Sequence, residues 1–122
     1  MAFISDNVFD SGLSWADTNG TRLDICSADP GGTYATVTGT TLGNETVNVG
    51  APEDGAVDGR KVVVPAITTG SVTGTDTATH WAVTNGTDTV VASGSLTAPQ
   101  AVTSGNTFTL DAIDIALRDA TS

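Results

Sequence analysis

The first sixteen residues carry the apolar spacing of a helix. Ser5 is a favourable N-terminal cap, and with Ser5 in that place Ile4 and Phe9 occupy the two positions of a hydrophobic staple. The pattern predicts a short helix that ends near Trp15. A helix of this length is marginally stable by itself, so it must dock on its own sheet or on a neighbouring subunit. Its expected apolar face is formed by Val8, Phe9 and Leu13.

After Trp15 the spacing of apolar positions changes to a period of two, which indicates β-strands. Asn19-Gly20 is a turn signal, and a second one, Asn85-Gly86, separates two strand patterns and predicts a hairpin. Pro65 lies inside an apolar pattern and therefore places that strand at a sheet edge or a bulge. The predicted strand segments are residues 21–26, 34–42, 46–49, 61–67, 71–75, 78–83, 89–94 and 107–117.

The last of these segments changes the face on which its apolar side chains lie. Phe108 and Leu110 stand at even positions, whereas Ile113 and Ile115 stand at odd ones. One face can stay buried only if a bulge at residues 111–112 absorbs the slip. Seven to eight short strands with frequent turns predict an all-β fold, either a sandwich or a small barrel. We expect a helix or arm at residues 1–16 and a β domain at residues 17–122.

Composition narrows the function classes. The 122 residues include 22 threonines and 14 glycines, as expected for strands and turns, and the net charge is −10. A chain this acidic is poorly suited to a phosphate backbone, so we expect no nucleic-acid partner. No apolar run is long enough to span a bilayer, and residues 1–12 lack the basic start and apolar stretch of a signal peptide. The single cysteine excludes an internal disulfide.

Few residues are candidates for chemistry. His80 is the one histidine, and a lone histidine in a strand is usually structural, as a free Cys26 usually is. We therefore expect no enzymatic activity, catalytic residue, cofactor or metal. Whether a cation binds stays open for two oxygen-rich clusters, each of which would need further ligands. These clusters are Asp17 with Asp24, and Glu53 with Asp54 and Asp58.

Candidate binding residues lie in two places, the N-terminal segment and the acidic loop with its following basic pair. A mixture of charges favours a protein partner over a nucleic acid. Trp15, Tyr34 and Trp81 would form a sugar-binding platform if they shared one face, but each is more simply explained as filling a core or interface. The predicted partner-binding residues are Phe3, Ile4, Val8, Phe9, Glu53, Asp54, Asp58, Arg60 and Lys61.

Two stretches resemble a known group of proteins. They are TNGTRLDIC at residues 18–26 and GTDTATHWAV at residues 74–83, with a continuation through residues 94–96 to 105–108. This arrangement resembles small structural proteins from the virions of tailed bacteriophages that infect proteobacteria. The resemblance covers most of the chain, and the family's implied role is capsid decoration, also called cement.

The resemblance implies a non-enzymatic protein on the outer surface of the virion capsid. It would bind the major capsid protein, as a homotrimer, and stabilise junctions between capsomers. Two alternatives remain, namely a tail, tail-tip or fibre component and a carbohydrate-binding β module.

Overall fold

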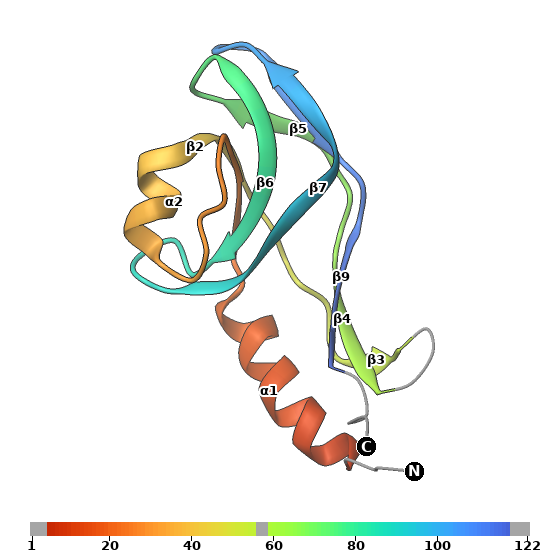
Figure 1. Cartoon of the computed structure of the whole chain (residues 1–122). Helices are drawn as coiled ribbons and strands as arrows, with labels where there is room; N and C mark the ends of the chain where they lie inside the picture. The colour runs from red at the N-terminus through yellow and green to blue at the C-terminus, as the bar shows by residue number, and fades with distance from the viewer. Residues whose placement is uncertain (1–4, 56–58, 118–122) are drawn as a thin grey trace.

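The computed structural model describes residues 5–55 and 59–117. This part of the chain forms two helices and nine strands (Figure 1). They are α1 (Asp6–Asn19), β1 (Arg22–Cys26), α2 (Tyr34–Thr40), β2 (Thr41–Thr46), β3 (Glu53–Asp54), β4 (Arg60–Val64), β5 (Ile67–Val72), β6 (Asp76–Thr84), β7 (Val90–Val102), β8 (Thr107–Leu110) and β9 (Ile113–Leu117).

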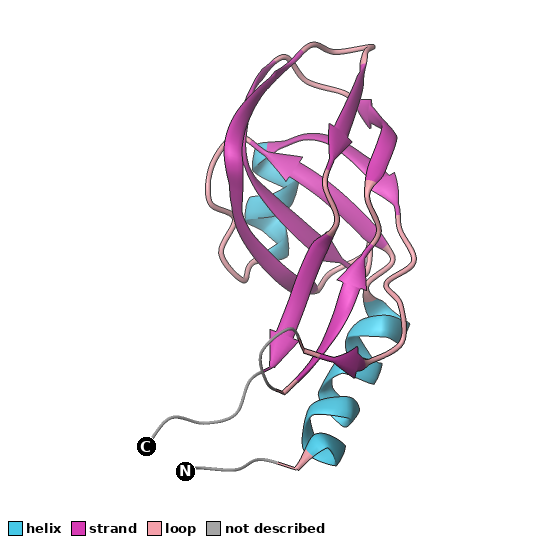
Figure 2. Cartoon of the chain, turned by 90° about the vertical axis from the view of Figure 1, so that its right-hand side faces the viewer, coloured by secondary structure: helices cyan, strands magenta, loops and turns pink. Residues whose placement is uncertain are grey.

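The strands form two antiparallel sheets. Six strands pair in the order β7-β6-β1-β2-β5-β8, and three pair in the order β3-β4-β9. The larger sheet curls strongly, while the smaller one runs down beside α1 (Figures 1 and 2). The predicted strand at residues 21–26 and the β6–β7 hairpin are confirmed, and the mostly β character with an N-terminal helix agrees with the expected fold class.

Two strands of one long ribbon pass from the larger sheet to the smaller one. β5 pairs with β8 in the larger sheet, and their continuations β4 and β9 pair with each other in the smaller sheet. The passage occurs at Pro65-Ala66 on one strand and at Asp111-Ala112 on the other. The predicted interruptions at Pro65 and at residues 111–112 are therefore present, and they mark a change of sheet. Because of this change, Phe108 on β8 and Ile115 on β9 both pack on the main core.

The main core lies between the curled sheet, the ribbon and α1. Leu23 and Ile25 of β1 are fully buried in it, as are Val62 and Val64 of β4. A smaller cluster of Cys26, Val37 and Ala82 lies under α2. Cys26 therefore points away from Leu23 and Ile25, as alternation along the strand predicts.

The N-terminal helix is longer than expected and is rotated relative to the predicted face. Ser5 caps it and accepts a hydrogen bond from the Asn7 amide at 3.2 Å, which confirms the predicted start. The helix continues past Trp15 to Asn19, so the predicted end near Trp15 is wrong, and Asn19-Gly20 is the junction between α1 and β1. Gly20 is the C-terminal cap, and its backbone N–H donates to the Ala16 carbonyl oxygen. A Cβ at Gly20 would lie 2.7 Å from that oxygen, so a larger residue would not fit here.

The buried face of α1 also differs from the prediction. It is formed by Phe9, Leu13 and Ala16, and it packs against β4. Val8 is 62% exposed and lies outside this face, because it is turned about 100° around the helix from Phe9. The staple residue Ile4 lies outside the described residues.

The predicted strand at residues 34–42 is wrong over most of its length. Residues Tyr34–Thr40 form α2, and only Thr41 and Leu42 belong to a strand. Threonine composition favours strands, but here the Thr38 hydroxyl donates to the Ala35 carbonyl and the Thr40 hydroxyl donates to the Thr36 carbonyl. Val37 on the inner side of α2 is buried against Cys26 and Ala82, and this packing stabilises a helix that its own residues do not favour. The weak strand pattern at residues 46–49 is likewise strand only at Thr46.

Gly70 is expected to be indispensable to the fold. It pairs with Phe108 across β5 and β8, and a Cβ at this position would overlap the Phe108 ring. We expect Gly70→Ala to lower the free energy of unfolding by about 1–3 kcal/mol, as overpacking of a core does. Chemical denaturation followed by circular dichroism measures the change. Gly39→Ala is the matched control, because a Cβ there meets nothing within 4 Å and alanine favours a helix. Equal stability of the two variants would contradict the prediction.

Candidate partner-binding surface

Arg60 ties three elements together at one end of the molecule. It stands at the start of β4, and its Nε donates to Asp10 Oδ1 on α1 at 2.8 Å. Its Nη1 donates to Asp54 Oδ1 on β3 at 2.6 Å, and Nη2 donates to the Pro52 carbonyl at 3.4 Å. The hydrogen bond to Asp10, and then the one to Asp54, raises the pKa of the Arg60 guanidinium. We call Arg60, Asp10 and Asp54 the Arg60 clamp.

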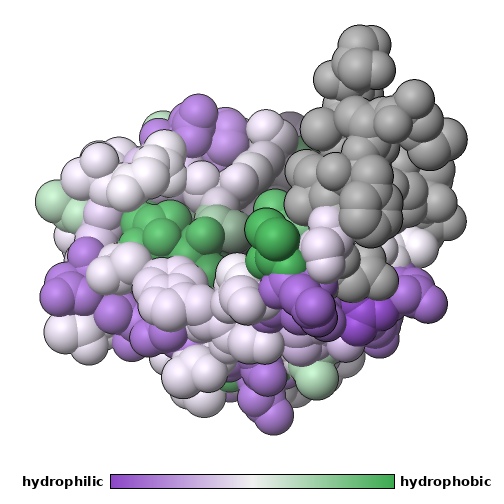
Figure 3. All heavy atoms as spheres, turned by 90° about the horizontal axis from the view of Figure 1, so that it is seen from below, coloured by the Kyte–Doolittle hydropathy of each residue, from purple (hydrophilic) through white to green (hydrophobic). Residues whose placement is uncertain are grey.

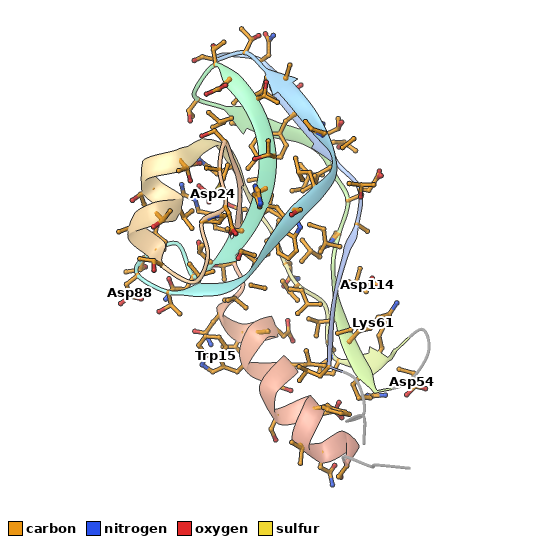
Figure 4. The ribbon with its side chains drawn as sticks, in the orientation of Figure 1. Trp15, Asp24, Asp54, Lys61, Asp88 and Asp114 are labelled. Carbon is orange, nitrogen blue, oxygen red and sulfur yellow. The ribbon has the colours of Figure 1, made fainter. Side chains whose placement is uncertain are left out.

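Lys61 makes a second set of links beside it. Its Nζ donates to Asp114 Oδ2 on β9 at 3.1 Å and lies 3.8 Å from Glu53 Oε1 on β3. Figure 4 shows Lys61, Asp114 and Asp54 on the same side of the molecule. The structure thus brings together Glu53, Asp54, Arg60 and Lys61. The positive groups of Arg60 and Lys61 are paired with carboxylates of the same chain, so they are not free to pair with those of a partner.

An apolar stripe lies on the outer side of α1. Val8 and Trp15 are seven residues apart, which is two helical turns, and they are 62% and 50% exposed. Gly12 lies between them, and Leu117 of β9 reaches it, since a Cβ on Gly12 would be 3.6 Å from Leu117 Cδ1. Leu117 is itself 40% exposed. We call Val8, Gly12, Trp15 and Leu117 the α1 stripe.

Within the α1 stripe, Trp15 is set apart from the charged residues, whereas Leu117 pairs with Arg60 in the β4–β9 ladder. Trp15 lies on the side of α1 that faces away from Lys61 and Asp114 (Figure 4). Seen from below, this end of the molecule shows apolar side chains flanked by polar ones (Figure 3). Among the described residues, Val8, Trp15 and Leu117 are the large apolar side chains that are exposed, and all three belong to this one stripe.

The predicted partner-binding residues therefore have different positions. Val8 is exposed in the stripe, whereas Phe9 is only 4% exposed and belongs to the core. Phe3, Ile4 and Asp58 lie outside the described residues. Sequence reasoning did not join Trp15 or Leu117 to Val8. The seven-residue spacing of Val8 and Trp15 was the available signal.

The other polar candidates are held by neighbours within the fold. Asp24 is buried and accepts hydrogen bonds from Arg22 Nε at 2.9 Å and from the Thr41 hydroxyl at 2.7 Å. His80 Nδ1 lies 2.8 Å from the Thr79 hydroxyl, and Nε2 lies 3.4 Å from the Ser95 hydroxyl. In the part of the chain that the structure describes, no three histidine, cysteine, aspartate or glutamate side chains are grouped as metal ligands.

The three aromatic residues considered as a sugar platform come from three different elements. Trp15 is on α1, Tyr34 is on α2 and Trp81 is on β6. Only Trp81 lines the groove of about 380 Å³ that lies between β7 and the junction of β8 with β9.

Comparison of the chain with protein-family models, with curated proteins and with solved structures found no match. Within residues 5–55 and 59–117, no helix has both the length and the apolar character needed to cross a membrane.

The Arg60 clamp is expected to hold α1 against β4. Replacing Arg60 with Gln removes the charge that meets Asp10, so the amides of α1 should exchange hydrogen several-fold faster in mass-spectrometric exchange experiments. Lys61→Gln is the matched control, because the ion pairs of Lys61 among the described side chains are with β3 and β9 and not with α1. It should accelerate exchange in β9 and leave α1 unchanged. Unaltered exchange of α1 in Arg60→Gln would show that its buried apolar face holds the helix alone.

Cys26 is expected to be unreactive in the folded protein. Burial raises the pKa of its thiol, and the charge of Asp24 adds to this effect while a hydrogen bond with Thr40 opposes it. Since the thiolate is the reactive form, an aromatic disulfide reagent should react slowly at neutral pH and faster only as the pH passes well above the usual thiol range. The same reagent should react at once in guanidinium chloride. Rapid reaction of the folded chain would place Cys26 at an opening of the structure.

Proposed function

We propose that the chain is a non-enzymatic structural protein that decorates the outer surface of a tailed-phage capsid. It would bind the major capsid protein as a homotrimer and stabilise junctions between capsomers. The sequence resemblance at residues 18–26 and 74–83 supports this role. The structural observation that carries the proposal is the α1 stripe, an exposed apolar surface on a helix whose core-facing side is already buried against β4.

The α1 stripe has the composition of a protein contact. Contiguous exposed apolar side chains favour association, and tryptophan is enriched among the residues that dominate binding energy. The side chains beside the stripe on α1 are uncharged, since Ser11 and Ser14 flank it. A partner could therefore cover Trp15 and Val8 without burying an unpaired charge, which would be costly.

The charge of the molecule supports a position on the outside of the shell. The chain carries 14 acidic and 4 basic residues, and the described basic residues Arg22, Arg60 and Lys61 each form an ion pair with a carboxylate. The surface is thus strongly negative, which disfavours contact with packaged DNA. A capsid surface with basic side chains around an apolar pocket would complement it.

We also propose that the curled sheet is a small barrel left open along one seam. β7 and β8 are the two end strands of this sheet and do not pair with each other. A side-chain hydrogen bond still joins them, since Gln100 Nε2 on β7 donates to the Thr109 carbonyl on β8 at 3.1 Å. This link across the seam supports near-closure of the sheet.

Quantitative mass spectrometry of purified particles tests the proposed function. We expect the chain to be present in a simple ratio to the major shell protein, which means hundreds of copies. Particles assembled with Trp15→Ser should contain markedly fewer, since truncation of a dominant interface tryptophan typically costs at least about 2 kcal/mol, or about thirtyfold in affinity. Thr103→Ala, at an exposed position between β7 and β8, should leave the copy number unchanged.

Other outcomes would contradict this assignment. A handful of copies per particle would indicate a tail, tail-tip or fibre component. Absence from particles would exclude a virion role and favour the carbohydrate-binding alternative. Full occupancy by Trp15→Ser would leave decoration in place but remove the α1 stripe from the attachment surface.

A further inference from the structure

The groove between β7 and the β8–β9 junction has an apolar floor and a polar rim. Trp81, Leu96 and Ile113 contribute to the floor, and each is partly buried against the main core. The volume of about 380 Å³ lies at the lower end of the range of small-molecule pockets, ~300–1,000 Å³. The groove belongs to the seam and is separate from the α1 stripe.

The indole of Trp81 is held in place by a glycine. Trp81 pairs with Gly94 across β6 and β7, and a Cβ on Gly94 would lie 2.9 Å from Trp81 Cζ2 and 3.1 Å from Nε1. The missing side chain at Gly94 therefore gives room to the ring. Trp81 lines the groove from this fixed position, and no hydrogen bond of its indole N–H is found among the described residues. A fixed aromatic ring with a polar edge is a suitable platform for a ligand that is apolar on one face.

Polar side chains also line the groove. Asp111 is exposed at the strand junction and presents a carboxylate. The side-chain amide of Gln100 donates one N–H to the Thr109 carbonyl. The Gln100 amide oxygen is thereby left as an acceptor. Thr97 adds a hydroxyl, which can donate or accept. The rim thus combines acceptors and donors of the kind that hydroxyl groups pair with.

The lining favours a neutral ligand over an anionic one. Among the described residues that line the groove there is no lysine or arginine, and the described basic side chains are paired elsewhere. A phosphate or carboxylate ligand would therefore meet Asp111 without a compensating cation. A quaternary ammonium ligand is also poorly matched, because such ligands are held by several aromatic rings and this groove has one.

The edge of β7 is also poorly suited to the addition of a peptide strand. Ala78 pairs with Gln100 and His80 with Ser95, so residues 96–99 of β7 lie opposite Thr79 alone. This bulge interrupts the regular row of backbone groups, and Pro99 within it has no N–H to donate. An added strand needs that row, whereas a compact ligand does not.

We infer that the groove is a binding site for a neutral carbohydrate, with one sugar ring stacked on Trp81 and its hydroxyl groups bonded to Asp111 and Gln100. The C–H face of a pyranose matches the indole, and its hydroxyl groups match the rim. This site is independent of the proposed attachment through the α1 stripe, so either could fail without the other.

Tryptophan fluorescence offers a direct test, because the chain has two tryptophans. In the full-length Trp15→Phe variant, Trp81 is the one remaining tryptophan. Maltotriose, cellotriose and N,N′,N″-triacetylchitotriose are each titrated to about 10 mM. We expect at least one to change the emission saturably, with a dissociation constant of about 0.1–10 mM, as suits an open groove. No saturable change with any of the three would overturn the proposal.

Rim variants locate the binding. In the Trp15→Phe background, Asp111→Ala and Gln100→Ala should each weaken it by about tenfold, since each removes a hydrogen-bonding group. Asp76→Ala is the matched control at an exposed position outside the groove and should bind as the parent does. Circular dichroism verifies that each variant is folded. Undiminished binding by both rim variants would place the sugar elsewhere and overturn the assignment.

Discussion

The structure depends on the passage of one two-stranded ribbon from the larger sheet into the smaller one. Pro65 lacks the N–H that a continuous strand would use, and the partner strand breaks opposite it at Asp111-Ala112. Because both strands break together, β4 and β9 stay paired while they leave the curled sheet. The departing pair supplies the surface on which α1 docks, and the break itself forms one wall of the groove beside β7. One local interruption thus generates both surface features of the molecule.

Two basic residues of β4, Arg60 and Lys61, hold this arrangement together. Arg60 and Lys61 are adjacent on β4, so their side chains point to opposite faces. Arg60 forms ion pairs with α1 and β3, and Lys61 forms ion pairs with β3 and β9. Individual exposed ion pairs contribute little to stability, but a cation that meets carboxylates from two elements restrains their relative positions. With these cations engaged, the acidic surface has little positive charge to offer. The α1 stripe is the exposed apolar part of this surface.

The sequence predicts those elements whose local signals agree with their packing. Alternation defines β1, the Asn85-Gly86 signal marks the β6–β7 connection, and Ser5 caps α1 as its side chain suggests. Prediction is wrong where tertiary contact overrides composition. Residues 34–40 contain threonines and a glycine yet form α2. The reason is that Val37 is buried on the inner side of this helix and that threonine hydroxyls donate to backbone carbonyls of the helix. The exposure of Val8 could not be predicted, because the helix has apolar residues on two sides and only the position of β4 decides which side is buried.

The two sides of α1 differ in a way that bears on why the stripe exists. Phe9 and Leu13 already bury the inner face, whereas the outer Val8 and Trp15 leave half or more of their surface in solvent. Exposed tryptophan on a helix is costly in solution, since burial of a large apolar side chain is worth about 1.5–3 kcal/mol. Gly12 has no side chain, so the centre of the stripe does not protrude from the helix. Leu117, which lies beside Gly12, extends the stripe onto β9. The ion pair of Arg60 with Asp10 restrains α1 relative to β4. A strip on a restrained helix would lose less conformational entropy on association than one on an unrestrained helix.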